Sequence, residues 1–321
     1  MPDRFKVIVD SLNVRRTPSL AGAIIGSLGK DDVVEQIGVS EDGSWQNIRK
    51  GELVGWSSRR YLVPFTPEAG VGPLDEILHI ASTSAIASYR WKNRGLAPLG
   101  YIKGMAMVFG RVYCKLQSGD PAALEMAKAN TGDRGKDVLA WYAQQFRDAG
   151  MDNEAAGAST LRHLFVLVIG LGMRESSGKY CEGRDRSASN TRAETAEAGL
   201  FQMSFDATKG NPLLRELFGH YLANPSGFVD FFKEGVRCRA SDLQNLGSGQ
   251  GRDFQRLSKE CPAFAVECAA VALRSMRRHW GPINRREAEL KPECNMMLLK
   301  VQNAVDTSQL CSHAELNPLR L

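Results

Sequence analysis

The feature that most constrains the fold of this chain is an apolar run of helical period that ends in a carboxylate. Between Ser159 and Glu175 apolar residues recur at spacings of three and four, which places them on one face of a helix. Glu175 follows Leu171 by four residues and so falls on the same face. Withdrawing a carboxylate from water raises its pKa, the condition for a general acid near neutral pH. Glu175 is therefore a candidate acid.

Glu175 alone does not define a site, because a lone Glu after an apolar run more often caps an exposed helix end. The residues downstream change that interpretation. Arg174-Glu175-Ser176-Ser177-Gly178 is followed, after a polar segment rich in carboxylates, by Ala198-Gly199-Leu200-Phe201-Gln202.

This order of motifs resembles the lysozyme-like superfamily, including goose-type lysozymes and bacterial lytic transglycosylases. There the acid Glu ends a buried helix, a short β-hairpin follows, and a Gly-Leu-Met/Phe-Gln segment opens the next helix beside the sugar cleft. The resemblance implies that Glu175 is the acid and that residues 180–198 form the hairpin. It implies that the cleft segment consists of Gly199, Leu200, Phe201 and Gln202.

A glycosidase also needs a carboxylate opposite the acid, to activate water or to stabilise an oxocarbenium-like transition state. The acids between Tyr180 and Ala198 are Glu182, Asp185, Glu194 and Glu197. In goose-type lysozymes an Asp shortly before the Gly-Leu-Met-Gln segment is associated with water activation, and this chain has none there. Glu194, five residues before Gly199, is the nearest match, and Glu197 is the second.

Three residues later in the chain are candidates for binding the sugar. The apolar run from Phe264 to His279 is followed by Trp280 and Asn284, and Tyr221 is a further candidate. An aromatic ring can stack on a pyranose face, and an amide can bind an N-acetyl group. A simple helix stop is the alternative explanation for Trp280 and Asn284.

The first sixty or so residues read as short β-type runs separated by turn residues. Leu12-Asn13-Val14-Arg15, Gly26-Ser27-Leu28, Gly43-Ser44-Trp45 and Gly55-Trp56-Ser57-Ser58 occur in the order of a bacterial SH3 (SH3b) domain, which this region resembles. The resemblance implies a small barrel that attaches an enzyme to cell-wall peptide or glycan. If Trp45 and Trp56 are core residues instead, the domain is a spacer.

These patterns predict an α+β multidomain protein: a small all-β SH3-like barrel, then a mainly α lysozyme-like domain with a short β-hairpin. We expect the SH3-like domain at 1–66, a Pro- and Gly-rich linker at 67–76 and the catalytic domain at 77–321. Helical patterns cover residues 74–89, 99–116, 122–129, 138–147, 159–175, 213–222, 228–234, 254–257 and 264–279.

Net charge and composition limit the kinds of partner that we expect. A net charge of +5 favours association with an anionic wall polymer, and no nucleic-acid motif is visible. No apolar run is long enough to span a bilayer, and no Sec-type signal peptide opens this numbering. We expect a monomer that acts in the cell envelope or outside the cell, exported by a non-Sec route or by a leader absent from this numbering.

The seven cysteines contain no Cys-x-x-Cys pair and no histidines at metal spacing, so neither a metal nor another cofactor is expected. Cys238 and Cys261 flank a Gly/Ser-rich loop and could close it as a disulfide outside the cytosol. Buried reduced thiols are the alternative.

The sequence thus predicts a bacteriolytic, muramidase-like hydrolase that cleaves β-1,4 bonds in peptidoglycan or a related N-acetylated glycan. The alternatives are a lytic transglycosylase, a chitinase or chitosanase, and a wall-binding protein with an inactive lysozyme-like fold. Retention of Glu175 argues against the last.

Overall fold

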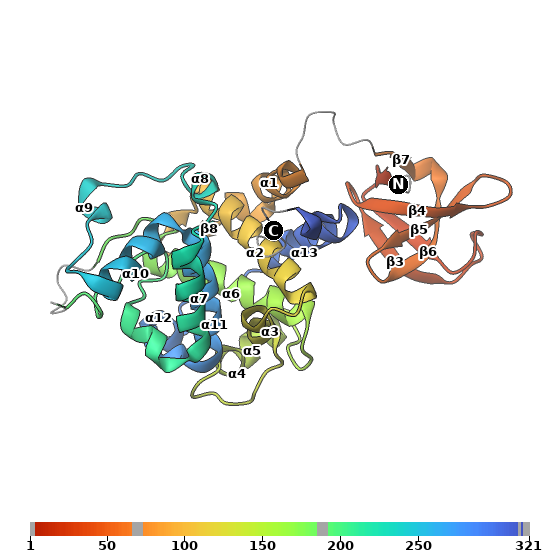
Figure 1. Ribbon diagram of the computed structural model, residues 1–321. Coiled ribbons are helices and arrows are strands. Elements are labelled where there is room, and N and C mark those ends of the chain that lie inside the picture. The colour runs from red at the N-terminus through yellow and green to blue at the C-terminus, as the bar shows by residue number, and fades with distance from the viewer. Residues whose placement is uncertain (1–3, 66–72, 185–191, 314–315, 317–321) are drawn as a thin grey trace. The chain divides into compact units, whose positions relative to one another are not determined.

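The computed structural model describes residues 4–65, 73–184, 192–313 and 316. By its internal contacts the chain divides into two compact units, residues 1–76 with 303–310 and residues 77–302 with 311–321. The first contains an antiparallel sheet, and the second is mostly helical (Figure 1). Of the predicted linker, residues 67–72 lie outside the described residues, and residues 73–76 begin the first helix.

The sheet of the first unit has seven strands in the order β3-β2-β6-β5-β4-β1-β7. The strands are β1 (Arg4–Val7), β2 (Ser11–Arg15), β3 (Ile24–Gly29), β4 (Val33–Val39), β5 (Trp45–Lys50), β6 (Leu53–Ser58) and β7 (Leu62–Pro64), with a 3-10 turn η1 (Arg59–Tyr61). All neighbouring pairs are antiparallel. Among the described residues β3 and β7 are the edges, so the sheet is not closed.

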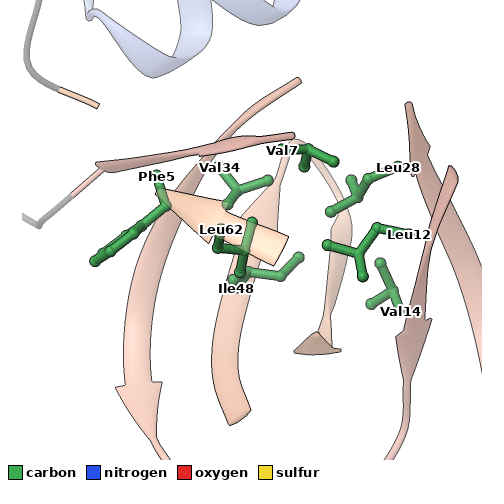
Figure 2. Close-up of a cluster of buried hydrophobic side chains, with 8 residues drawn as sticks. All are labelled: Phe5, Val7, Leu12, Val14, Leu28, Val34, Ile48 and Leu62. Atoms are coloured by element: carbon green, nitrogen blue, oxygen red, sulfur yellow. The ribbon is translucent and has the colours of Figure 1, made fainter. Parts of the chain in front are cut away.

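One face of this sheet carries the core of the first unit. Strand residues alternate between the two faces, and the inward ones are the apolar positions of the sequence. The buried cluster consists of Phe5, Val7, Leu12, Val14, Leu28, Val34, Ile48 and Leu62 (Figure 2). At about 25 cal/mol per Å² of buried apolar surface, this cluster is the main stabilising term of the sheet.

Trp45 and Trp56 lie on the opposite face and are not core residues. In β5 Trp45 alternates with the buried Gln46 and Ile48, and in β6 Trp56 stands between the buried Gly55 and Ser57. The pairing of the two strands sets Asn47 opposite Trp56. Directly paired residues share a face, so both indoles stand on the same surface of β5 and β6, where both are half-buried.

The second unit is built from helices, short 3-10 turns and one two-stranded hairpin. The longer helices are α1 (Pro73–Thr83), α2 (Leu99–Gln117), α3 (Pro121–Ala127), α6 (Ala158–Ser176), α7 (Pro212–Ala223), α10 (Gly249–Glu260), α11 (Pro262–Ser275) and α13 (Pro292–Thr307). The shorter ones are α4 (Val138–Trp141), α5 (Ala143–Asp148), α8 (Val229–Phe232), α9 (Ala240–Leu243) and α12 (Gly281–Asn284). The remaining elements are η2 (Ala85–Ser88), η3 (Phe205–Gly210), η4 (Arg277–His279), η5 (Leu310–Ser312), β8 (Arg90–Trp91) and β9 (Gly95–Leu96).

Helices α6 and α11 form the centre of this unit. Both are apolar on nearly every face, as helices enclosed by others are, and their middle residues are fully buried. Helix α6 packs against α2, α3, α11 and α12. The periodic apolar run between Ser159 and Glu175 is therefore a core helix, and its last turn carries Glu175.

Two buried ion pairs cross this core. Arg274 forms a bidentate pair with Asp137, at 3.0 and 3.1 Å, and Asp137 also caps α4 by accepting from the Leu139 N–H. Lys115 pairs with Glu267 at 2.7 Å, and the Tyr221 hydroxyl donates to the other Glu267 oxygen at 2.6 Å. Buried charges without such partners cost several kcal/mol each, so these bonds hold the helices in one arrangement.

The cysteine pairing differs from the expected one. Cys238 is bonded to Cys181, and Cys114 to Cys311, whereas Cys261 is a free, buried thiol. The predicted Cys238–Cys261 disulfide is therefore wrong. The spacing around the Gly/Ser-rich loop carried no information on Cys181, which the fold brings to Cys238 from the segment after α6.

The hairpin predicted at 180–198 falls partly on residues 185–191, outside the described residues. Its described part consists of turns and irregular chain, with one isolated β-bridge between Ala198 and Met203. The only β-hairpin that the described residues of this unit contain is β8–β9, which the sequence did not predict. No helix in the described ranges is long and apolar enough to cross a membrane.

Candidate functional site

The end of α6 fixes the backbone that carries Glu175. Ser177 adopts a left-handed conformation, φ 55°, and Gly178 donates its N–H to the Gly172 carbonyl at 3.2 Å, which closes the helix. Gly172 lets Tyr101 pack against the same turn, because a Cβ there would overlap the Tyr101 hydroxyl. That hydroxyl donates to the Ile169 carbonyl at 2.8 Å. The last turn of α6 is thus tightly held by α2.

The Glu175 carboxyl is half-buried, and its pKa is raised to about 7. Burial is the largest cause, and the negative charge of Glu197 adds to it. Three positive charges act in the opposite direction: Arg94, Arg285 and Arg174. Glu175 therefore keeps its proton over much of the range in which an ordinary Glu has lost it.

The two candidates for the second carboxylate differ in their surroundings. Glu197 is half-buried and acts on Glu175 through its charge. The Glu194 side chain is 42% exposed and lies 3.8 Å from Arg192, and its backbone carbonyl accepts from the Asp206 N–H. Of these two carboxylates, Glu197 is the one whose charge acts on Glu175. Motif spacing had favoured Glu194 over Glu197.

Glu287 organises the positive charges around Glu175. Its carboxylate accepts from Arg174 at 3.0 Å and from Arg285 at 2.9 Å. The hydrogen bond from Arg285 is the first cause that lowers the pKa of Glu287, to about 2, so this group stays anionic. Arg94 donates to the Arg174 carbonyl. Sequence reasoning gave none of these four residues a role. Arg174 belongs to the motif around Glu175, Arg285 and Glu287 lie two residues apart in a later segment, and Arg94 comes from an earlier one.

The segment Gly199–Gln202 forms a tight turn, not the start of a helix. Gly199 has φ +75°, and a Cβ there would lie 2.5 Å from the Ser258 carbonyl oxygen. Gln202 has φ +47°, and its Nε2 donates to the Gly199 carbonyl at 3.0 Å. Leu200 and Phe201 are buried. Only the backbone and the half-buried Gln202 could face a ligand.

The three late candidates lie elsewhere or serve the scaffold. Trp280 is 2% exposed, and its indole N–H donates to the Phe201 carbonyl at 2.8 Å, so the ring is a core residue that holds the turn. Tyr221 is also 2% exposed and belongs to the Glu267 ion pair. Asn284 is exposed, but both ends of its amide bond to the loop before it, at Arg277 and the Arg278 carbonyl. Burial of both rings does not fit the sugar-stacking role that their residue types suggested.

Among the described residues no group of three or more His, Cys, Asp or Glu side chains could hold a metal ion. No protein-family model matches the chain, and no curated protein or solved structure matches it. The chemistry of the site therefore has to be argued from its own residues.

The raised pKa of Glu175 predicts a pH-dependent cost to folding. Below pH 4.5 the carboxyl is protonated in both states; between pH 4.5 and 7 the unfolded chain releases the proton while the folded chain keeps it. The wild type should therefore lose stability relative to Glu175→Gln as pH rises through this window, by roughly 2–3 kcal/mol, and the difference should stay constant above it.

Urea unfolding of both proteins across that pH range measures this difference. Glu194→Gln is the matched control, because its exposed side chain should leave the pH dependence of the wild type intact. A Glu175→Gln profile parallel to that of the wild type would show that Glu175 is not held protonated by the fold.

Proposed function

We propose that the helical unit cleaves β-1,4 glycosidic bonds in peptidoglycan or a related N-acetylated glycan, with Glu175 as the general acid. The observation that carries the proposal is a half-buried carboxyl whose pKa lies at about 7, with a second carboxylate, Glu197, acting on it. A carboxyl that holds its proton near neutral pH can act as the general acid, and a neighbouring carboxylate can serve as the second group. The resemblance of the surrounding motifs to lysozyme-like enzymes supports the substrate class.

In this mechanism neutral Glu175 protonates the leaving glycosidic oxygen, and the anionic Glu197 activates a water or stabilises the positive charge that develops on the sugar. Proton transfer leaves a carboxylate at Glu175. Arg94, Arg174 and Arg285, which lower the pKa of Glu175, stabilise that product charge. Glu287 pairs with Arg174 and Arg285, so its negative charge limits how far these two arginines lower the pKa of Glu175.

The turn at Gly199–Gln202 is the proposed sugar contact. Its left-handed residues aim backbone groups in directions that a regular helix would not allow. The Trp280 indole N–H holds the turn in place by donating to the Phe201 carbonyl. The substrate would then be held by the backbone and by the Gln202 amide, not by a stacked ring.

A lytic transglycosylase is the second candidate. It needs one acid/base, and the attacking group is a hydroxyl of the substrate, so it has no need of a second carboxylate. The observation that favours it is the lack of an Asp ahead of Gly199, together with the exposed position of Glu194. The role of Glu197 separates the two candidates.

We further propose that the sheet unit is an SH3-like wall anchor and that the protein acts in the cell envelope or outside the cell. Half-exposed indoles on one sheet face suit contacts with peptide or glycan. The disulfides Cys114–Cys311 and Cys181–Cys238 fit an oxidising compartment.

Replacing the carboxyls one at a time tests the mechanism. Glu175→Gln keeps the shape but has no transferable proton, so turnover on purified peptidoglycan should fall by about 10²–10⁴-fold. In a hydrolase Glu197→Gln should also cost much activity, whereas the matched Glu194→Gln should cost little. Near wild-type turnover of Glu175→Gln would remove this residue from the mechanism, and an unaffected Glu197→Gln would favour the transglycosylase.

The anchor is tested by Trp45→Ala/Trp56→Ala in the full chain. Loss of two stacking rings should lower pull-down by insoluble cell wall several-fold and leave turnover on short soluble oligosaccharides unchanged. Val63→Ala, which truncates another partly exposed side chain of the sheet, is the control. Unchanged pull-down by the double variant would make the sheet unit a spacer.

A further inference from the structure

Three arginines gather around Trp141 in the helical unit. The guanidinium carbons of Arg277, Arg286 and Arg134 lie 4.0, 4.3 and 5.5 Å from the centroid of the Trp141 ring. A fourth, Arg278, acts on Arg277 through its charge. We call these four residues the Trp141 arginine cluster. Cation–π contacts of this kind hold guanidinium groups near one another on a shared ring.

Backbone carbonyls and one amide, not carboxylates, hold the cluster in place. Arg277 is 5% exposed and donates to the Arg134 carbonyl at 2.6 Å and to Asn284 Oδ1 at 2.7 Å. Arg286, at φ +55°, donates to the Trp141 carbonyl at 3.3 Å. The Trp141 indole N–H donates to the Ile283 carbonyl at 2.9 Å. The arrangement is therefore fixed by the fold without neutralising any of the four charges.

The cluster carries an unbalanced positive charge. Within the described ranges of the chain, no carboxylate lies within 4.0 Å of the guanidinium nitrogens of these four residues. Burial lowers the pKa of the Arg277 guanidinium, and the other three arginines lower it further, while Asp133 opposes them. The other three members of the cluster, Arg134, Arg278 and Arg286, are exposed. Like charges held together with no carboxylate in ion-pair contact favour the binding of an anion.

The same loop links the cluster to the candidate acid. Arg285 precedes Arg286 in the chain, pairs with Glu287 and acts electrostatically on Glu175. Helix α12, between Trp280 and Arg285, packs on α6, which carries Glu175. An anionic chain bound at Glu175 could therefore extend onto the arginines.

We propose that the Trp141 arginine cluster binds carboxylates of the glycan strand that is cleaved at Glu175. This inference rests on the proposed function and sharpens it. Peptidoglycan carries carboxylates on its peptide stems, and on its lactyl ethers wherever a stem is absent, whereas chitin carries none. The planar fork of Arg pairs with a carboxylate through two parallel hydrogen bonds, so several arginines along a surface select an anionic strand over a neutral one.

The test removes two exposed charges of the cluster and leaves its buried member in place. The variant is Arg134→Gln/Arg278→Gln, and the matched control is Arg215→Gln/Arg252→Gln, which removes two exposed positive charges from α7 and α10. The probes are fluorescently labelled soluble peptidoglycan strands and the same strands with their carboxylates converted to amides. Fluorescence anisotropy of the full-length protein gives the dissociation constants.

We expect the cluster variant to bind the charged strands about 3–10-fold more weakly, because it loses two exposed ion pairs and each contributes only modestly to binding. The amidated strands should bind to it as they do to the wild type. The control should bind both as the wild type does. Strands freed of their peptides expose the lactyl carboxylates in place of the stems, so a loss that persists on them shows that the cluster also binds those groups. A loss that disappears assigns the contact to the stems.

Equal losses on charged and amidated strands, or no loss on either, would overturn the proposal. So would tighter binding of a DNA duplex than of the charged strand, if the cluster variant abolished it. Turnover of neutral N-acetylated oligosaccharides separates this inference from the proposed function: the cluster variant should retain it. If the proposed function is wrong, the Glu175→Gln variant should cleave these neutral oligosaccharides as well as the wild type does.

Discussion

The site depends on the exclusion of water from the last turn of α6. Because this helix is enclosed by α2, α3, α11 and α12, the carboxyl at its end is withdrawn from solvent and keeps its proton to about pH 7. Three arginines pull the pKa down, and Glu197 pushes it up. The balance between burial and these charges sets the pKa of Glu175, so the helices that enclose α6 determine the protonation of this carboxyl.

Local periodicity was sufficient to predict where Glu175 lies but not what surrounds it. The spacing of apolar residues from Leu161 to Leu171 predicted a buried helix with Glu175 in its last turn, and the structure has both. The choice between Glu194 and Glu197 depended on the path of the chain through a turn, which residue spacing does not encode. Arg285 and Glu287 reach the site through tertiary packing, so no local pattern pointed to them.

Residue type did not predict burial where a polar atom has its hydrogen-bond partner inside the protein. Trp280 and Tyr221 look like sugar-binding aromatics, but the indole N–H bonds to the Phe201 carbonyl and the phenol bonds to Glu267, which allows both rings to be buried. The pairing of Cys238 with Cys181 follows the same rule, since contact in the fold decides it. In the sheet unit the sequence predicted the short β-runs but left the side of Trp45 and Trp56 open, and the strand pairing decided it.

The most direct test of the account is the chemical form of the products that the protein releases from purified peptidoglycan in isotopically labelled water. A hydrolase with Glu175 as acid and Glu197 acting on water predicts reducing-end fragments that carry one labelled oxygen in the mass spectrum. Fragments with anhydro ends and no label would contradict the second carboxylate's role. The absence of any glycan fragment from a folded protein would contradict the central claim.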